Sequence, residues 1–186
     1  RSRTISNGGG FTSQKPVKRA YEQDPKKLAR WLETDYPEIA ARAKRYKAEI
    51  HWGDETGIQN DSYNAKGFSP KGKAPVVRLN AKKSRINMIS AITNNGKVRF
   101  MLYQEKMSSP LLIKFMSRLI KDTNRKVFLI LDNLKVHHSK KVAAWLEANH
   151  GKIEVFYLPP YAPEHNPDEY LNGDLKQRIR SGLPTR

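Results

Sequence analysis

Residues 126–133 read KVFLILDN, and they give the strongest indication of the fold class. Five consecutive apolar residues between polar ones are typical of a short strand that is buried on both faces of a sheet. Such a strand needs helices packed above and below it. Asp132 follows at once, at the end where a parallel strand delivers side chains into the crevice of an α/β sheet. The stretch therefore predicts a central strand and a candidate site at its carboxyl end.

The flanking sequence supplies the other elements of the domain. A short strand is expected over residues 49–58, ending at the acidic pair Asp54-Glu55, and Asn94-Asn95-Gly96 is a hairpin signal between two strand-like runs. The full set of expected strands is 49–58, 74–79, 86–93, 97–104, 126–133 and 152–158, and the expected helices are 108–123, 139–151 and 166–182. The first strands are joined by hairpins, and the later ones are separated by helices. This order predicts an α/β fold with a mixed sheet flanked by helices.

Residues 1–47 differ from the rest of the chain in composition and in expected secondary structure. The first nineteen residues are rich in Gly, Ser and basic residues, and an extended segment is expected there. Two short helices are predicted next, the first capped by Asp24 with Pro25 at its first position and the second beginning at Pro37. Their spacing predicts a buried stripe of Leu28, Trp31, Leu32, Ile39 and Ala43.

Charge is the strongest compositional signal. The chain has 35 Lys and Arg against 18 Asp and Glu, a net charge of +17, which predicts a polyanionic partner such as nucleic acid. A basic surface that serves only solubility is the alternative. No apolar run approaches the ~20 residues of a membrane helix, and no signal peptide is found, so an intracellular location without a membrane partner is expected.

Residues 62–99 concentrate this positive charge and contain no acid. A stretch of one sign on strands and turns predicts a surface that follows phosphates without reading bases, although scattered solvating charge would give the same composition. The candidate nucleic-acid-binding residues are Lys66, Lys71, Lys73, Arg78, Lys82, Lys83 and Arg85, with Lys97 and Arg99 beyond them.

Acids stand in three places at the ends of expected elements: Asp54, Asp132 and the stretch 158–176, which contains Glu164, Asp168, Glu169 and Asp174. Carboxylates brought together raise one another's pKa unless a cation lies among them. The chain has no Cys, so a metal would be held by oxygen or imidazole ligands, which points to Mg²⁺ or Mn²⁺ and to two-metal phosphoryl transfer. The structural alternatives are that Asp132 caps a turn and that Glu169 belongs to a helix start.

Three motifs together resemble the DDE transposases of the Tc/mariner superfamily, in particular its bacterial insertion-sequence branch. They are WGDETG at 52–57, LDNLKVHHSKK at 131–141 and LPPYAPEHNPDE at 158–169. The resemblance implies a ribonuclease-H-like five-stranded sheet. It also implies that two Mg²⁺ or Mn²⁺ ions are held by Asp54, Asp132 and Glu169.

Two further residues have accessory positions in this resemblance. Asp168 is the rival of Glu169 for the third ligand position. His137 matches a family histidine and is expected to orient the site or to contact a phosphate, whereas joint metal binding with His138 is not expected because adjacent side chains diverge.

The resemblance also has implications for domains and partners. It implies a catalytic domain over residues 48–186 that cleaves double-stranded DNA and transfers 3′-OH ends, in the bacterial cytoplasm with the nucleoid, with a homodimer as one possible assembly. The family's helix-turn-helix region is missing, and 36 residues separate Asp132 from Glu169, slightly more than is usual. Residues 1–47 are accordingly interpreted as a remnant that follows the missing region, and the chain as a fragment. The alternatives are a ribonuclease-H-like nuclease without strand transfer and a non-catalytic DNA-binding remnant.

Overall fold

A five-stranded mixed sheet forms the centre of the molecule, in the order β3-β2-β1-β4-β5. The computed structural model describes residues 24–59, 85–160 and 166–181. Strand β1 pairs antiparallel with β2, which pairs antiparallel with β3, whereas β1, β4 and β5 are parallel. The strands are β1 (Glu49–Gln59), β2 (Arg85–Thr93), β3 (Val98–Tyr103), β4 (Val127–Leu131) and β5 (Ile153–Tyr157). The predicted mixed sheet is confirmed, and the strand expected at 74–79 lies outside the described residues.

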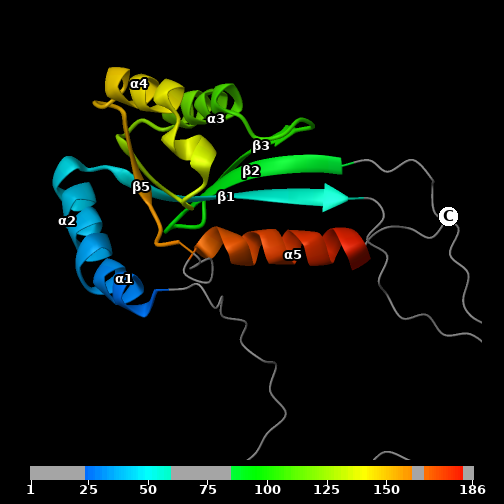
Figure 1. The fold of residues 1–186 in the computed structure, drawn as a ribbon, viewed down its shortest axis with the longest axis horizontal. Coiled ribbons are helices and arrows are strands. Elements are labelled where there is room, and N and C mark those ends of the chain that lie inside the picture. The colour runs from blue at the N-terminus through cyan, green and yellow to red at the C-terminus, as the bar shows by residue number, and fades with distance from the viewer. Residues whose placement is uncertain (1–23, 60–84, 161–165, 182–186) are drawn as a thin grey trace, which may run out of the picture.

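Helices cover both faces of this sheet, as Figure 1 shows. Helices α3 (Ser109–Asp122) and α4 (Lys140–Ala148) lie on one face, preceded in α4's case by the short 3₁₀ helix η2 (Lys135–His138). Helices α1 (Pro25–Arg30), α2 (Tyr36–Tyr46) and α5 (Pro167–Ser181) lie on the other. This is the two-sided cover that the apolar run at 127–131 requires.

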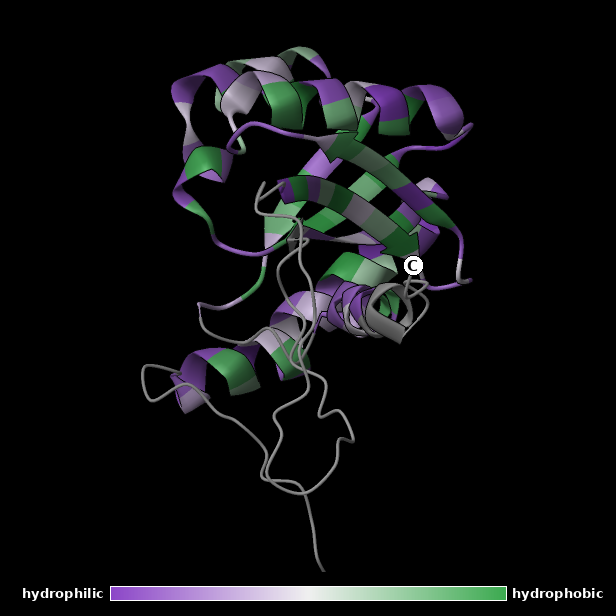
Figure 2. Cartoon of the chain, turned by 90° about the vertical axis from the view of Figure 1, so that its right-hand side faces the viewer, coloured by the Kyte–Doolittle hydropathy of each residue, from purple (hydrophilic) through white to green (hydrophobic). Residues whose placement is uncertain are grey.

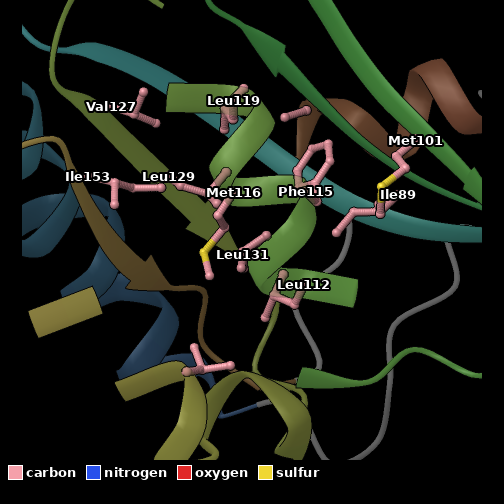
Figure 3. Packing of buried hydrophobic residues seen from close by; sticks show 12 residues of the cluster. Ile89, Met101, Leu112, Phe115, Met116, Leu119, Val127, Leu129, Leu131 and Ile153 are labelled. Atoms are coloured by element: carbon pink, nitrogen blue, oxygen red, sulfur yellow. The ribbon is translucent and has the colours of Figure 1, made fainter. Parts of the chain in front are cut away.

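The side chains of β4 divide between the two faces. Leu129 and Leu131 belong to the larger cluster, where they pack with Phe115, Met116 and other residues of α3 (Figure 3). Ile130 belongs to a smaller cluster on the α1–α2 side. All five strand residues are buried, so the uninterrupted apolar run is explained by alternation into two cores.

The N-terminal helices differ from the prediction in one respect. Residues 25–46 are helical throughout, because a π-helical turn, η1 (Trp31–Asp35), joins α1 to α2. Pro37 has no N–H to donate, and the π turn accommodates this by bonding the Tyr36 N–H to the carbonyl of Trp31, five residues earlier. The extra residue shifts the helical phase, so Leu32 is 42% exposed, not buried as predicted.

Among the other predicted features of these helices, the Asp24 cap and the burial of Trp31, Ile39 and Ala43 agree with the structure, whereas Leu28 is only half-buried. Asp24 caps α1 by accepting from the N–H groups of Lys26 and Lys27, while Ile39 and Ala43 are buried. Figure 2 shows hydrophobic residues on the strands and hydrophilic ones on the outer turns of the helices. In the described part of the chain, no helix is long and apolar enough to cross a membrane.

Candidate catalytic site

Two of the predicted acids lie side by side at the carboxyl end of β4. The parallel pairing of β1 with β4 ends at Trp52 and Ile130, so Asp54 and Asp132 each lie two residues further along. Asp54 is inside β1, because this strand continues to pair with β2 and places Asp54 opposite Ser90. The predicted range 49–58 agrees with β1, but the expected end of the strand at the Asp54-Glu55 pair was wrong: β4 ends at Leu131, whereas β1 continues because β2 supplies its partner.

A glycine next to Asp54 permits the close approach of these strands. A Cβ atom at Gly53 would lie 2.7 Å from Cδ2 of Leu131 and 3.2 Å from the Ser90 carbonyl oxygen. No side chain fits there without displacement of its neighbours. The glycine thus keeps β1 close to the end of β4, where Asp132 follows.

Helix α5 begins beside this glycine and carries the third predicted acid. The Asn166 side chain donates from Nδ2 to the Gly53 carbonyl (2.9 Å) and accepts from the Asp168 N–H (3.1 Å). It is 2% exposed, so both bonds are shielded from water. One side chain therefore caps the helix and fixes its first turn against β1.

Asp168 and Glu169, adjacent in that first turn, have different surroundings. Asp168 is 0% exposed and accepts a 2.7 Å hydrogen bond from the Ser90 hydroxyl at Oδ2. Burial raises the pKa of Asp168 to about 7. Glu169 is solvent-exposed, and partial desolvation of its carboxyl group together with the nearby Asp54 charge raises its pKa. Asp168 faces the sheet, whereas Glu169 is accessible.

Asn172, one turn further along α5, contacts Asp54 directly. Its Nδ2 donates to Asp54 Oδ2 at 2.8 Å, and the Asn172 side chain is 2% exposed. Burial raises the pKa of Asp54, and this hydrogen bond opposes the rise by favouring the ionised form.

His137 links Asp132 to a fourth acid, Glu55. The His137 ring is buried, with Nδ1 2.9 Å from the Asp132 carbonyl oxygen and Nε2 3.3 Å from Glu55 Oε1. Burial lowers the pKa of His137, but the hydrogen bonds to Glu55 and Asp132 and their charges raise it to a net value above the ordinary one. Both partners only accept hydrogen bonds, which favours the doubly protonated imidazolium. His138 is exposed, and its ring centroid lies 4.3 Å from that of Tyr157, which the His137 ring also faces at 6.4 Å.

Mutual repulsion among these acids is visible at Asp132. Burial and the charges of Asp54, Glu55 and Glu169 raise the pKa of Asp132 to about 6, while the nearby His137 opposes the rise. The Asp132 side chain is 41% exposed, so the position is open to solvent. Four carboxylates that act on one another in this way form a site of strongly negative potential in a basic protein.

The donor set fits a hard divalent cation by its chemistry. Asp54, Asp132 and Glu169 offer oxygen ligands, and a cation among them would relieve the repulsion that raises the Asp132 pKa. Within residues 24–59, 85–160 and 166–181, no three His, Asp or Glu side chains converge closely enough to hold one metal ion. The acids are gathered at one end of the sheet but are not arranged as a closed coordination shell.

Of the seven predicted nucleic-acid-binding residues, Arg85 is the one within the described part of the chain. Lys66, Lys71, Lys73, Arg78, Lys82 and Lys83 lie outside the described residues. Arg85 begins β2, is exposed, and donates from Nε to Asn87 Oδ1 at 2.8 Å.

Three residues that contact the site acids were not predicted from the sequence: Glu55, Asn172 and Ser90. Glu55 had a usable signal, because strand alternation places it on the face opposite to Asp54. Asn172 lies three residues after Glu169, a spacing that puts both on neighbouring positions of one helix face. No sequence signal identified Ser90, because its place opposite Asp54 depends on the pairing of β2 with β1.

The family follows from a comparison with known families. Residues 49–185 match the model described as DDE superfamily endonuclease. The chain belongs to this family. No curated protein sequence matches it.

Solved structures similar to this DDE endonuclease chain share its fold. The Mos1 strand transfer complex matches with a TM-score of 0.64 at 20% identity, covering 91% of this chain and 53% of that one. The Mos1 mariner paired end complex with Mn matches with a TM-score of 0.66 at 19% identity, over 92% and 54%. The catalytic domain of Mos1 mariner transposase matches with a TM-score of 0.54 at 16% identity, over 91% and 77%. This chain thus spans about half the length of the Mos1 chains in the complexes, and the shared architecture is the expected ribonuclease-H-like fold.

Proposed function

We propose that this chain is the catalytic domain of a Tc/mariner-type transposase from the bacterial insertion-sequence branch. It cleaves DNA strands at transposon ends with the help of divalent metal ions and joins the 3′-OH ends to target DNA. The observation that carries this proposal is the meeting of Asp54, Asp132 and α5 at one end of the sheet, in a chain of the DDE endonuclease family.

Asp54, Asp132 and Glu169 are the proposed ligands of two Mg²⁺ or Mn²⁺ ions. Their oxygen donors suit these ions, and related Mos1 complexes are described with Mn and with Mg. When bound, the ions supply Lewis acidity for the attacking water or 3′-hydroxyl and for the leaving oxygen. Asp168 is not a proposed ligand, because it is fully buried and bonded to Ser90.

His137 is the proposed positioning residue for Asp132. Its Nδ1 lies 2.9 Å from the Asp132 carbonyl oxygen and 3.4 Å from Oδ1 of the same residue. A fixed ring at this place limits the rotation of the Asp132 carboxylate, and Glu55 fixes the ring from its other nitrogen.

The proposed partner is double-stranded DNA, held by the basic residues of the chain. The net charge of +17 supports this. A Mos1 complex is described with a left transposon end and as a paired-end complex, which supports transposon-end DNA as the substrate and a homodimer as the assembly. We further propose that residues 1–47 precede the catalytic domain, since the family match begins at residue 49, and that the protein acts at the bacterial nucleoid.

The test is a pair of assays on duplex DNA that carries the ends of the element. The proposal expects Mg²⁺-dependent nicking that Asp132→Asn abolishes, and joining of pre-cut 3′-OH ends to a target duplex. Nicking without joining would favour a ribonuclease-H-like nuclease. DNA binding with neither activity in the presence of Mg²⁺ or Mn²⁺ would favour a non-catalytic DNA-binding remnant.

A further inference from the structure

A buried polar seam joins α5 to the sheet beneath the candidate site. We define the seam as Ser90, Asn166, Asp168 and Asn172, all of which are at most 2% exposed. Ser90 donates to Asp168 at 2.7 Å, and its Oγ lies 3.5 Å from Asn172 Oδ1. Buried polar groups are costly unless they are paired, so the seam accepts only one register of the helix on the strands.

Asn172 is the member of the seam that reaches Asp54. A carboxylate only accepts hydrogen bonds, so the amide group facing Asp54 Oδ2 at 2.8 Å is the NH₂ group. The bond restricts rotation of the Asp54 side chain. Glu169 stands on the same helix, three residues earlier, so the seam sets the positions of two acids at once.

We propose that Asn172 is a positioning residue that holds the Asp54 carboxylate in the orientation needed for a divalent cation. The inference rests on the proposed function, because it assumes that Asp54 binds metal. Hydrogen bonds that orient metal ligands typically contribute about 10- to 100-fold in metal affinity. Asn172 touches the ligand, not the reacting groups.

The test compares two variants of the seam by Mn²⁺ titration calorimetry in the absence of DNA. Asn172→Leu removes the donor to Asp54 at similar side-chain size. Ser90→Ala, the matched control, removes the donor to Asp168 and the long 3.5 Å contact with Asn172 Oδ1, and it keeps the Asn172 Nδ2 donor to Asp54. We expect Mn²⁺ affinity to fall about tenfold or more in Asn172→Leu and to stay within about twofold in Ser90→Ala. Thermal unfolding of both variants reports on the fold, and Asn172→Ala replaces Asn172→Leu if leucine does not fit.

The outcomes test the role of Asn172 separately from the proposed metal-dependent function. Equal Mn²⁺ affinity in wild type and Asn172→Leu would leave only a structural role and overturn the inference, with the proposed function intact. Equal losses of affinity in both variants would also overturn it, because they would reflect general loosening of α5. Absence of Mn²⁺ binding by the wild type would overturn the proposed function itself.

A second, independent observation lies at the opposite end of the sheet. A hollow of about 610 Å³ is lined by four cations, Lys44, Lys47, Arg125 and Lys126, and by no acid. In the described part of the chain, only Lys126 of these four takes part in an ion pair, with Glu154. Tyr46, 52% exposed, lies at the hollow with Lys126 5.4 Å from its ring centroid.

The convergence of these cations is not explained by helix capping. Lys44 lies in the last turn of α2, where a cation complements the helix dipole. Arg125 and Lys126 come from the connection between α3 and β4, which has no such need. Unpaired cations from two segments, around a concave surface, fit a polyanion.

We infer that this basic hollow binds the phosphate backbone of duplex DNA at a second place, away from the acids. The separation is at least the five residues from Val127 to Asp132, about 17 Å along the strand. A duplex that contacts the acids and continues over this end of the sheet, or a second duplex, would be held there. The inference rests on the proposed function only in taking DNA as the partner.

The test measures DNA affinity as a function of salt for two charge-matched double variants. Lys44→Glu with Arg125→Glu reverses the charge at two of the four cationic positions that line the hollow. Lys114→Glu with Arg118→Glu, the control, makes the same change of charge on exposed positions of α3. We expect the hollow variant to lose about tenfold or more in affinity near 0.1 M salt and to lower the salt slope by about 2, with a smaller change in the control.

Each result decides a separate question. Equal losses in both variants would assign the effect to net charge, and no loss in either would exclude contact at the hollow, so both results overturn the inference. A wild-type chain that binds no DNA would overturn the proposed function as well.

Discussion

At the residue scale, two adjacent acids of one helix turn are separated by environment. Asp168 and Glu169 follow one another in the sequence, yet Asp168 is sealed beneath α5 and Glu169 is exposed. Adjacent residues of a helix point about 100° apart. Asp168 therefore points to the sheet and Glu169 to solvent. The Asp168 carboxyl group anchors the helix through Ser90, whereas the Glu169 carboxylate is a candidate metal ligand.

The first prediction follows from this difference. Glu169→Gln is expected to lower DNA nicking at least about a hundredfold, because it removes a proposed ligand of the ions that activate the reaction. Asp168→Asn is expected to retain most of the activity, since an amide oxygen can still accept from Ser90. Full activity in Glu169→Gln together with an inactive but folded Asp168→Asn would reverse the assignment of the third ligand.

The pH dependence of stability gives a second prediction for Asp168. Its folded pKa, about 7, lies above that of an unfolded Asp, so its contribution to stability is complete below about pH 4 and is lost as the pH rises through about 7. Asp168→Asn cannot ionise and should lose less stability over this range, by on the order of 4 kcal/mol. Urea unfolding of both proteins in EDTA between pH 4 and 8 measures the difference. Parallel curves would show that Asp168 does not titrate in this window.

At the element scale, the site depends on how β1 meets its neighbours. β1 continues past the end of β4 because β2 pairs with its second half. Gly53 permits the approach, and Asn166 fastens the start of α5 to the same residue. The contact between β1 and α5 therefore depends on two residues: Gly53, which has no side chain to keep the strands apart, and Asn166, which hydrogen-bonds to both elements.

A matched pair of glycine substitutions tests the close approach. Gly53→Ala places a methyl group 2.7 Å from the Leu131 side chain and should destabilise the fold by about 1–3 kcal/mol. Gly173→Ala, in α5, meets nothing within 4 Å and should stabilise by up to about 1 kcal/mol. Urea denaturation measures both. Similar effects of the two changes would show that the strand packing tolerates a side chain at Gly53.

The helix start offers a further prediction. Asn166→Ala removes the cap of α5 and leaves the buried Gly53 carbonyl without its donor. The loss should be about 1–3 kcal/mol in the free energy of unfolding. Asn149→Ala, which removes a side-chain bond to the Trp145 carbonyl after α4, is a control away from the site. Only Asn166→Ala is expected to reduce nicking as well, because it loosens the helix that carries Glu169.

At the scale of the whole molecule, an acidic site stands in a strongly basic chain. The +17 net charge attracts DNA, while the gathered carboxylates repel phosphates unless cations neutralise them. DNA affinity should therefore fall steeply with salt, about 10³-fold or more between about 50 and 200 mM. Mg²⁺ should reduce the repulsion at the site. A flat salt dependence in a filter-binding titration would contradict a phosphate-dominated interface.

Much of this architecture could be predicted from local patterns. The buried strand at 127–131, the Asn94-Asn95-Gly96 turn and the apolar face of α3 were confirmed because each is set by spacing within a few residues. The π turn at Trp31–Asp35 was missed, because its cause, a proline within a continuous helix, reads equally well as a new start. The strand end expected at the Asp54-Glu55 pair was misplaced, because β1 continues for as long as β2 pairs with it.

Local patterns suffice to predict the elements, the positive charge and the acids at which chemistry is proposed, because period, composition and motif are properties of the chain. The burial of Asp168, the hydrogen bond from Asn172 to Asp54 and the link from Glu55 to Asp132 through His137 depend on the tertiary structure. These contacts join residues up to 118 positions apart. Their existence depends on strand order and helix register, which no local pattern encodes.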